Sequence, residues 1–161
     1  MVNLYGRRGS AEAKARAIIE PKAISMRILI VDDDQPHGES LVELLSSHGH
    51  EAYFAPSYGE AEWLCGLFRF DLSVIDFDMP HHTGPEVAER LRARNPELEV
   101  VIISAHRPSG ARLTVLGSLP FFPKPIEAAS FLSLVEGIAV RLRGSTLIVR
   151  QDFPLERRDP R

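Results

Sequence analysis

The sequence predicts an α/β domain with a parallel sheet covered by helices on both faces. Short apolar segments alternate with segments of helical periodicity, and this pair of segments occurs five times along the chain. Residues 28–31 are hydrophobic throughout rather than at every second position, which is typical of a strand buried on both faces. Five strand-then-helix units in succession are therefore expected to form one parallel sheet with crossover helices.

Five strands are predicted, at residues 27–31, 51–55, 71–76, 99–104 and 119–122. Pro120 and Pro123 border the last of these segments, and a proline cannot donate a hydrogen bond to a neighbouring strand. We therefore expect the fifth strand to be short and to lie at an edge of the sheet.

The helices are delimited by periodicity and by residues that begin or end helices. Leu41 and Leu45 share one face of the first helix, Pro36 suits its first turn and Gly49 suits its end. The other helices are predicted at residues 57–68, 84–95, 109–117 and 127–142. The fourth segment is short and weakly periodic, so we expect a truncated or irregular helix there.

Chain length and composition predict one domain with tails. A chain of 161 residues, 44% of them hydrophobic, can bury one good core but not two. We assign residues 26–143 to the domain, residues 1–25 to an N-terminal extension predicted to be disordered, and residues 144–161 to a C-terminal tail. Within this tail, the apolar residues 147–149 are compatible with one extra short strand.

Charge and cysteine content narrow the classes of function. The formal net charge of −3 gives no electrostatic case for binding nucleic acid or an anionic membrane, so we expect a protein partner. The single cysteine, Cys65, lies in an apolar stretch and is predicted to be a small core residue. The sequence contains no signal segment and no apolar run of membrane length, so the expected compartment is the cytoplasm.

The carboxyl ends of the predicted strands bring several acids together. Strand one ends at Asp32 and Asp33, strand three at Asp76 and strand four at Ser104, and Lys124 follows strand five. Ligands of parallel α/β sheets bind beyond this edge. Two carboxylates about 4 Å apart repel by about 4 kcal/mol at an effective dielectric constant near 20, and one lysine cannot balance three acids. A divalent cation can, and an all-oxygen ligand set suits Mg²⁺ or Mn²⁺ rather than zinc.

The same residues suit phosphoryl transfer. A carboxylate held beside Mg²⁺ can attack phosphorus and become an acyl phosphate, and Asp76 is the candidate nucleophile. The protein must then neutralise the phosphoryl oxygens, which requires a metal, an ammonium group and a hydroxyl or amide donor. Asp33, Lys124 and Ser104 provide these three kinds of group.

Four segments together resemble the receiver domain of two-component response regulators. They are Ile-Leu-Ile-Val-Asp-Asp-Asp at 28–34, Asp-Leu-Ser-Val-Ile-Asp-Phe-Asp-Met-Pro at 71–80 with Gly84, Val-Ile-Ile-Ser-Ala at 101–105, and Phe-Phe-Pro-Lys-Pro at 121–125. Each segment alone is weak, but their order and separation are specific. The resemblance covers about residues 26–142, and it implies a flavodoxin-like (βα)5 fold of three layers, α/β/α, with strand order 2-1-3-4-5.

The resemblance also implies roles for the acids. Asp32 and Asp33 would hold Mg²⁺, Asp33 more directly, and the main-chain carbonyl of Asp78 would complete the metal shell. Asp76 would be phosphorylated and would also contact the metal.

The remaining roles concern the phosphoryl group and the switch. Ser104 and Lys124 would bind phosphoryl oxygens, and the switch would consist of Ser104 moving toward the phosphoryl group while Phe121 turns inward. The chain would be a stand-alone receiver that catalyses only its own phosphorylation and dephosphorylation. A histidine kinase or phosphotransfer protein would donate the phosphoryl group, and the signal would leave through a protein partner that the sequence does not name, or through self-association as a homodimer.

Two alternatives remain open at this point. The first is a pseudo-receiver, which keeps the fold as a binding module without phosphorylation. The second is a haloacid-dehalogenase-like phosphatase, suggested by the Asp-x-Asp pair of Asp76 and Asp78, although in those enzymes the nucleophile follows the first strand and the acidic pair comes later. His81, His82 and His106 lie near the site and are predicted to be solvated loop residues.

Overall fold

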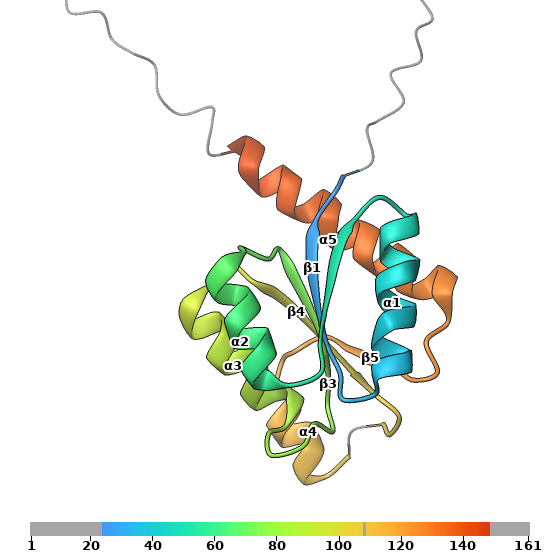
Figure 1. The fold of residues 1–161 in the computed structure, drawn as a ribbon, viewed down its shortest axis with the longest axis vertical. Helices are drawn as coiled ribbons and strands as arrows, with labels where there is room; N and C mark the ends of the chain where they lie inside the picture. Colours follow the sequence, from blue (N-terminus) through green and yellow to red (C-terminus); the bar gives the residue numbers. More distant parts are fainter. Residues whose placement is uncertain (1–23, 108, 149–161) are drawn as a thin grey trace, which may run out of the picture.

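A computed structural model describes residues 24–107 and 109–148, in which strands and helices alternate without exception (Figure 1). The strands are β1 (Arg27–Val31), β2 (Glu51–Ala55), β3 (Leu72–Asp76), β4 (Glu99–Ser104) and β5 (Phe121–Pro123). The helices are α1 (Gln35–Ser47), α2 (Tyr58–Leu67), α3 (Gly84–Arg94), α4 (Ala111–Leu116) and α5 (Ala128–Ile148).

All four neighbouring strand pairs are parallel, and the strand order is β2-β1-β3-β4-β5. Helices α2, α3 and α4 cover one face of the sheet, and α1 and α5 cover the other (Figure 1). The predicted three-layer fold and strand order are therefore confirmed.

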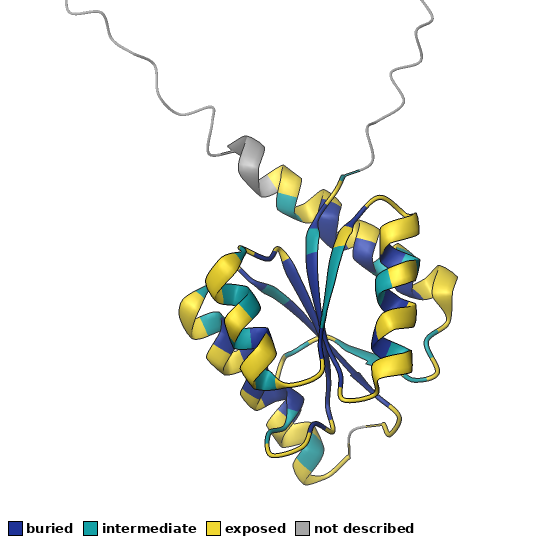
Figure 2. Cartoon of the chain, in the orientation of Figure 1, coloured by how far each residue is buried: buried dark blue, intermediate teal, exposed yellow. Residues whose placement is uncertain are grey.

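Each central strand contributes to two hydrophobic cores. Leu29 and Val31 of β1 pack with the α2, α3 and α4 side, whereas Ile28 and Ile30 pack with the α1 and α5 side. Because both faces are covered, every position of the strand interior is buried, as the dark central strands of Figure 2 show. This is the physical reason for the continuous apolar run.

Local signals in the sequence set the helix beginnings. Asp34 caps α1 by accepting a hydrogen bond from the His37 backbone N–H at 3.2 Å, and Ser57 caps α2 in the same manner. Thr83 and Glu86 form a capping box at α3. As expected, α4 is short, with six residues and no side-chain cap.

Two boundary predictions are wrong. Strand β5 runs from Phe121 to Pro123 rather than over 119–122, so Pro123 is its last residue. A proline is tolerated there because only β4 pairs with β5. Helix α5 continues to Ile148, so residues 147 and 148 are helical and form no extra strand. A helix satisfies its backbone hydrogen bonds internally, whereas a strand needs a free sheet edge beside it. Residues 1–23, which were predicted to be disordered, lie outside the described residues, and so do residues 149–161 of the predicted tail.

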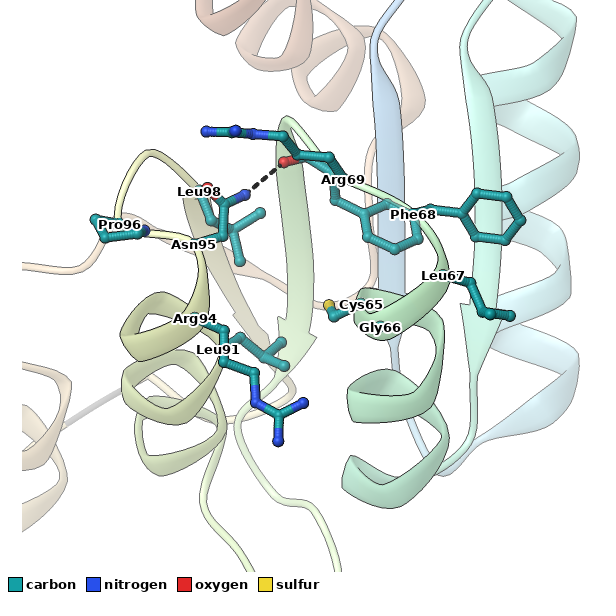
Figure 3. Close-up of a pocket in the computed structure, with 11 residues that line it drawn as sticks. Cys65, Gly66, Leu67, Phe68, Arg69, Leu91, Arg94, Asn95, Pro96 and Leu98 are labelled. Carbon is teal, nitrogen blue, oxygen red and sulfur yellow. Dashed lines mark hydrogen bonds between the residues drawn. The ribbon is translucent and has the colours of Figure 1, made fainter.

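A hollow of about 500 Å³ lies between the carboxyl ends of α2 and α3 (Figure 3). Asn95 at its wall donates a hydrogen bond to the Phe70 carbonyl at 3.0 Å, and Cys65 lines it half-buried, at the margin of the core rather than inside it. The hollow borders the beginning of β3, whereas Asp76 lies at the other end of the same strand. None of the helices among the described residues is long and apolar enough to span a bilayer.

Candidate functional site

The carboxyl edge of the sheet gathers the predicted site residues. Asp32 directly follows β1, Asp76 ends β3 and Ser104 ends β4, and all three are buried, with 0%, 5% and 0% of their surface exposed. Lys124 directly follows β5 and is held there by its backbone N–H, which donates to the Ser104 carbonyl at 2.8 Å. Four strands that are distant in sequence therefore deliver polar groups to one place.

Lys124 is the central cation of this site. Its Nζ lies 2.9 Å from Asp32 Oδ2 and 2.8 Å from Asp76 Oδ1, so it bridges the two buried carboxylates. His37 of α1 also contacts Asp32, with 2.6 Å between Nδ1 and Oδ2. Buried carboxylates are stable only when paired and hydrogen-bonded, and this arrangement provides both.

Burial and ion pairing act in opposite directions on the pKa values of Asp76 and Lys124. Burial raises the pKa of Asp76 above its ordinary value, and the hydrogen bond from Lys124 only partly offsets this effect. Burial alone would lower the pKa of Lys124, but its hydrogen bonds to Asp76 and Asp32 outweigh burial and raise that pKa. Lys124 is therefore charged, and Asp76 is a buried carboxyl group whose ionisation depends on neighbouring cations.

Three carboxylates are placed to share one cation. Asp32, Asp33 and Asp76 each offer an oxygen, and these oxygens all lie within 4.8 Å of one another. Asp33 is exposed, so a cation held here would keep water among its ligands. An all-oxygen set with room for water fits Mg²⁺ and similar hard dications.

A family model for the response regulator receiver domain matches residues 28–136. The chain belongs to this family. A receiver domain is a signalling domain rather than a conventional enzyme, and this one has the expected fold and acidic cluster.

Curated relatives and solved structures agree with this assignment. Response regulator MprA of Mycobacterium bovis is 31% identical over 122 residues, which cover 74% of this chain and 53% of that protein. The chain thus spans about half the length of the curated relatives it matches. The receiver domain of Methanospirillum hungatei has a TM-score of 0.69 at 23% identity, and covers 74% of this chain and 98% of its own. TrrA of Thermotoga maritima, solved with Mg²⁺ and beryllium fluoride, has a TM-score of 0.62 at 26% identity, covering 70% and 98%.

The Ser104 hydroxyl of this receiver domain is directed toward the loop after β3. It accepts hydrogen bonds from the His106 backbone N–H at 3.2 Å and from Arg112 Nη2 at 3.4 Å, and it lies 3.5 Å from Asp78 Oδ2. Within the described residues, its hydrogen bonds do not include Asp76. Phe121 is half-buried and packs against the core on the α2, α3 and α4 face.

The Asp78 side chain forms an ion pair with Arg112, a residue that the sequence did not indicate as part of the site. Arg112 Nη1 and Nη2 donate to the two Asp78 carboxylate oxygens at 2.8 and 2.9 Å. This ion pair lowers the pKa of Asp78, so the carboxyl group is ionised. The Asp78 backbone remains at the site, because its N–H donates to Asp76 Oδ2 at 2.9 Å.

Sequence reasoning missed Arg112 and His37 for different reasons. Arg112 is 34 residues from Asp78 in a weakly periodic segment, and no sequence signal links the two. His37 follows the Asp34 cap and Pro36, so the start of α1 was predictable, but its contact with Asp32 depends on the turn between them. The Asp34 side chain, next to Asp33 in the sequence, caps the start of α1.

The histidines predicted to be solvated have mixed environments. His106 is exposed, as expected. His82 instead packs its ring against Tyr58, with 5.5 Å between ring centroids, and contacts Arg90. His81 is exposed, as expected, and its φ of 68° lies in the left-handed region, where asparagine, aspartate and histidine are the most frequent residues besides glycine.

Removing Asp33 is expected to stabilise the metal-free protein. Asp33→Ala takes one charge out of the acidic cluster, so the melting temperature in EDTA should rise by roughly 2 °C or more, because repulsion is relieved. Glu89→Ala, which removes an exposed acid on α3 away from the cluster, is the control and should have little effect. A lower melting temperature for Asp33→Ala in EDTA would show that Asp33 is needed for structure.

Proposed function

We propose that this receiver domain accepts a phosphoryl group on Asp76 from a histidine kinase or a phosphotransfer protein, with Mg²⁺ as cofactor. The observation that carries the proposal is the buried Asp76 carboxylate, which Lys124 bridges to Asp32 and which shares a cluster with Asp32 and Asp33 in which all three oxygens lie within 4.8 Å of one another. Perturbed, buried carboxyls with a specific cationic partner are typical of functional sites.

The chemistry assigned to Asp76 is nucleophilic attack. One carboxylate oxygen forms a bond to phosphorus, the bond from phosphorus to the donor histidine nitrogen breaks, and the imidazole leaves with its electron pair. The result is an acyl phosphate on Asp76. Burial helps this step, because a carboxylate that is poorly solvated loses little hydration on reacting.

The cation would be held by Asp32, Asp33 and Asp76 with the main-chain carbonyl of Asp78. When bound, Mg²⁺ supplies charge neutralisation for the phosphoryl oxygens. Lys124 then transfers its hydrogen bond from Asp76 to a phosphoryl oxygen, which it reaches from its present place 2.8 Å from Asp76 Oδ1. Ser104 provides a hydroxyl donor once it leaves Asp78 and Arg112.

The proposed switch begins at Ser104, on the strand that pairs with β5. Movement of its hydroxyl toward Asp76 would empty space at the end of β4. Phe121 lies on β5 opposite Ile102 and has no hydroxyl, so it can turn inward without leaving a polar group unsatisfied. The altered face of α4, β5 and α5 would then be read by a protein partner or by a second copy of the chain.

The phosphatase alternative fits the geometry less well. A haloacid-dehalogenase-like mechanism needs the acid two residues after the nucleophile as a free proton donor. Here that acid, Asp78, is ionised and paired through both oxygens with Arg112. Turnover of a generic phosphate ester by the purified protein would restore this alternative.

The test is intact mass with peptide mapping after treatment with acetyl phosphate. The protein should gain one phosphoryl group on Asp76 when Mg²⁺ is present and none in EDTA, and Asp76→Asn should reduce the gain by roughly a hundredfold or more. Glu89→Ala serves as a control that leaves the site intact. If acetyl phosphate and a phosphorylated histidine donor both fail with Mg²⁺, the domain is a pseudo-receiver that binds its partner constitutively.

A further inference from the structure

Arg112 of α4 contacts two residues beside the acidic cluster, Asp78 and Ser104. The Arg112 guanidinium forms a two-point ion pair with Asp78, lies 4.1 Å above the centre of the Phe77 ring, and reaches Ser104 Oγ with Nη2. Two-point pairs between arginine and carboxylate are among the stronger and geometrically most defined contacts in proteins. The contact joins α4 to the loop that directly follows the phosphoacceptor strand.

This contact changes the charge balance of the site. Lys124 is already shared between Asp32 and Asp76, so it cannot also compensate Asp78. Without Arg112, the Asp78 carboxylate would be an additional uncompensated negative charge two residues from the phosphoacceptor. An incoming phosphoryl group is itself anionic and would be repelled by such a charge.

We propose that Arg112 is a positioning residue that withdraws the Asp78 carboxylate from the acidic cluster and thereby admits the anionic phosphoryl group. This inference rests on the proposed function and adds a residue to its machinery. Arg112 acts through Asp78 rather than as a direct phosphoryl ligand, because its hydrogen bonds go to the two Asp78 oxygens and to Ser104 Oγ.

A purely structural role for Arg112 makes a different prediction. Helix α4 has only six residues, is bounded by Gly110 and Gly117, both with positive φ, and buries Leu116 in the core. Arg112 could therefore serve only to anchor α4. Neutralising Asp78 separates the two roles, because it restores the charge balance of an Arg112 variant but cannot restore the anchor.

The experiment is a double-mutant cycle of beryllium fluoride binding in Mg²⁺, measured by calorimetry on the full chain. Arg112→Met should weaken binding roughly tenfold, the effect of one uncompensated charge near the site at an effective dielectric constant of 20 or more. Asp78→Asn keeps the main-chain carbonyl that is assigned to the cation and removes only the side-chain charge, so this variant alone should bind beryllium fluoride as tightly as the wild type does or more tightly. The double variant should return to within about threefold of the wild type, since its two charge changes cancel.

Two further variants complete the design. Arg94→Met removes an exposed arginine that pairs with Glu62 on α2 and not with the acidic cluster. This variant should bind beryllium fluoride like the wild type. Arg112→Lys keeps the positive charge and should lose less affinity than Arg112→Met even though it loses the two-point geometry. Melting curves of all variants establish that each is folded.

The outcomes separate the two proposals. Wild-type affinity in Arg112→Met overturns the inference about Arg112 alone, and so does a double variant that binds as weakly as Arg112→Met, which would assign Arg112 to anchoring α4. Absence of binding by the wild type, together with absence of phosphorylation, overturns the proposed function and this inference with it.

Discussion

Lys124→Met is expected to cost the metal-free protein about 3 kcal/mol of unfolding free energy, because breaking a buried ion pair leaves uncompensated charge in the interior. The side chain of Lys124 is 18% exposed, and those of its partners Asp32 and Asp76 are 1% and 7% exposed, so water cannot replace it well. Part of the loss will be relieved by protonation of Asp76, whose pKa burial already raises.

Urea unfolding in EDTA and in saturating Mg²⁺ measures this effect. A cation bound by the three acids should restore a large part of the lost stability, since it substitutes for the missing ammonium group. Phosphorylation by acetyl phosphate should remain roughly a hundredfold slower even in Mg²⁺, because Lys124 also neutralises the phosphoryl oxygens.

The control for Lys124 is a cation at the protein surface. Arg69 pairs with Glu97, and both side chains are largely exposed, so Arg69→Met should cost less than about 1 kcal/mol. If Lys124→Met unfolds at the same urea concentration as this control in EDTA, Lys124 is not the counter-charge that holds Asp32 and Asp76 in the interior.

Gly84→Ala is expected to disturb the phosphoacceptor strand directly. A Cβ at Gly84 would lie 2.4 Å from the backbone oxygen of Asp76 and 3.0 Å from the Phe77 Cα, and backbone atoms cannot move aside as a flexible side chain can. Either the start of α3 or the end of β3 must shift, at a cost of about 2 kcal/mol or more. The Gly84 N–H also donates to the Phe77 carbonyl at 2.9 Å, and this bond would be strained.

Two measurements check this prediction. The urea midpoint of Gly84→Ala should fall, and Mg²⁺-dependent phosphorylation of Asp76 should slow by roughly tenfold or more, because small displacements of a nucleophile are costly. Gly137→Ala is the matched control: it lies inside α5 with no atom near the added Cβ, and should gain about 0.5–1 kcal/mol. Equal stability of Gly84→Ala and the wild type would mean that the start of α3 accommodates the methyl group freely.

The fold was largely predictable because its signals are local. The continuous apolar run of β1, the Asp34 and Pro36 start of α1 and the sequence around Thr83 that begins α3 each specify one element from neighbouring residues. Errors arose where local signals compete with what surrounds the segment. The end of α5 at Ile148 and the place of Pro123 at the end of β5 depend on which sheet edges are free, and a short window of sequence does not contain that information.

For the site, too, one part was predictable from the sequence and another was not. The sequence by itself determined that Asp32, Asp33 and Asp76 would meet, because the carboxyl ends of parallel strands lie at one edge of a sheet. Only the tertiary structure decided how those charges are compensated, since side chains from the α1 start, the β5 end and α4 must converge in space. The bridge that Lys124 makes and the pairing of Asp78 with Arg112 depend on that convergence, and Coulomb interactions act over distance in space rather than along the chain.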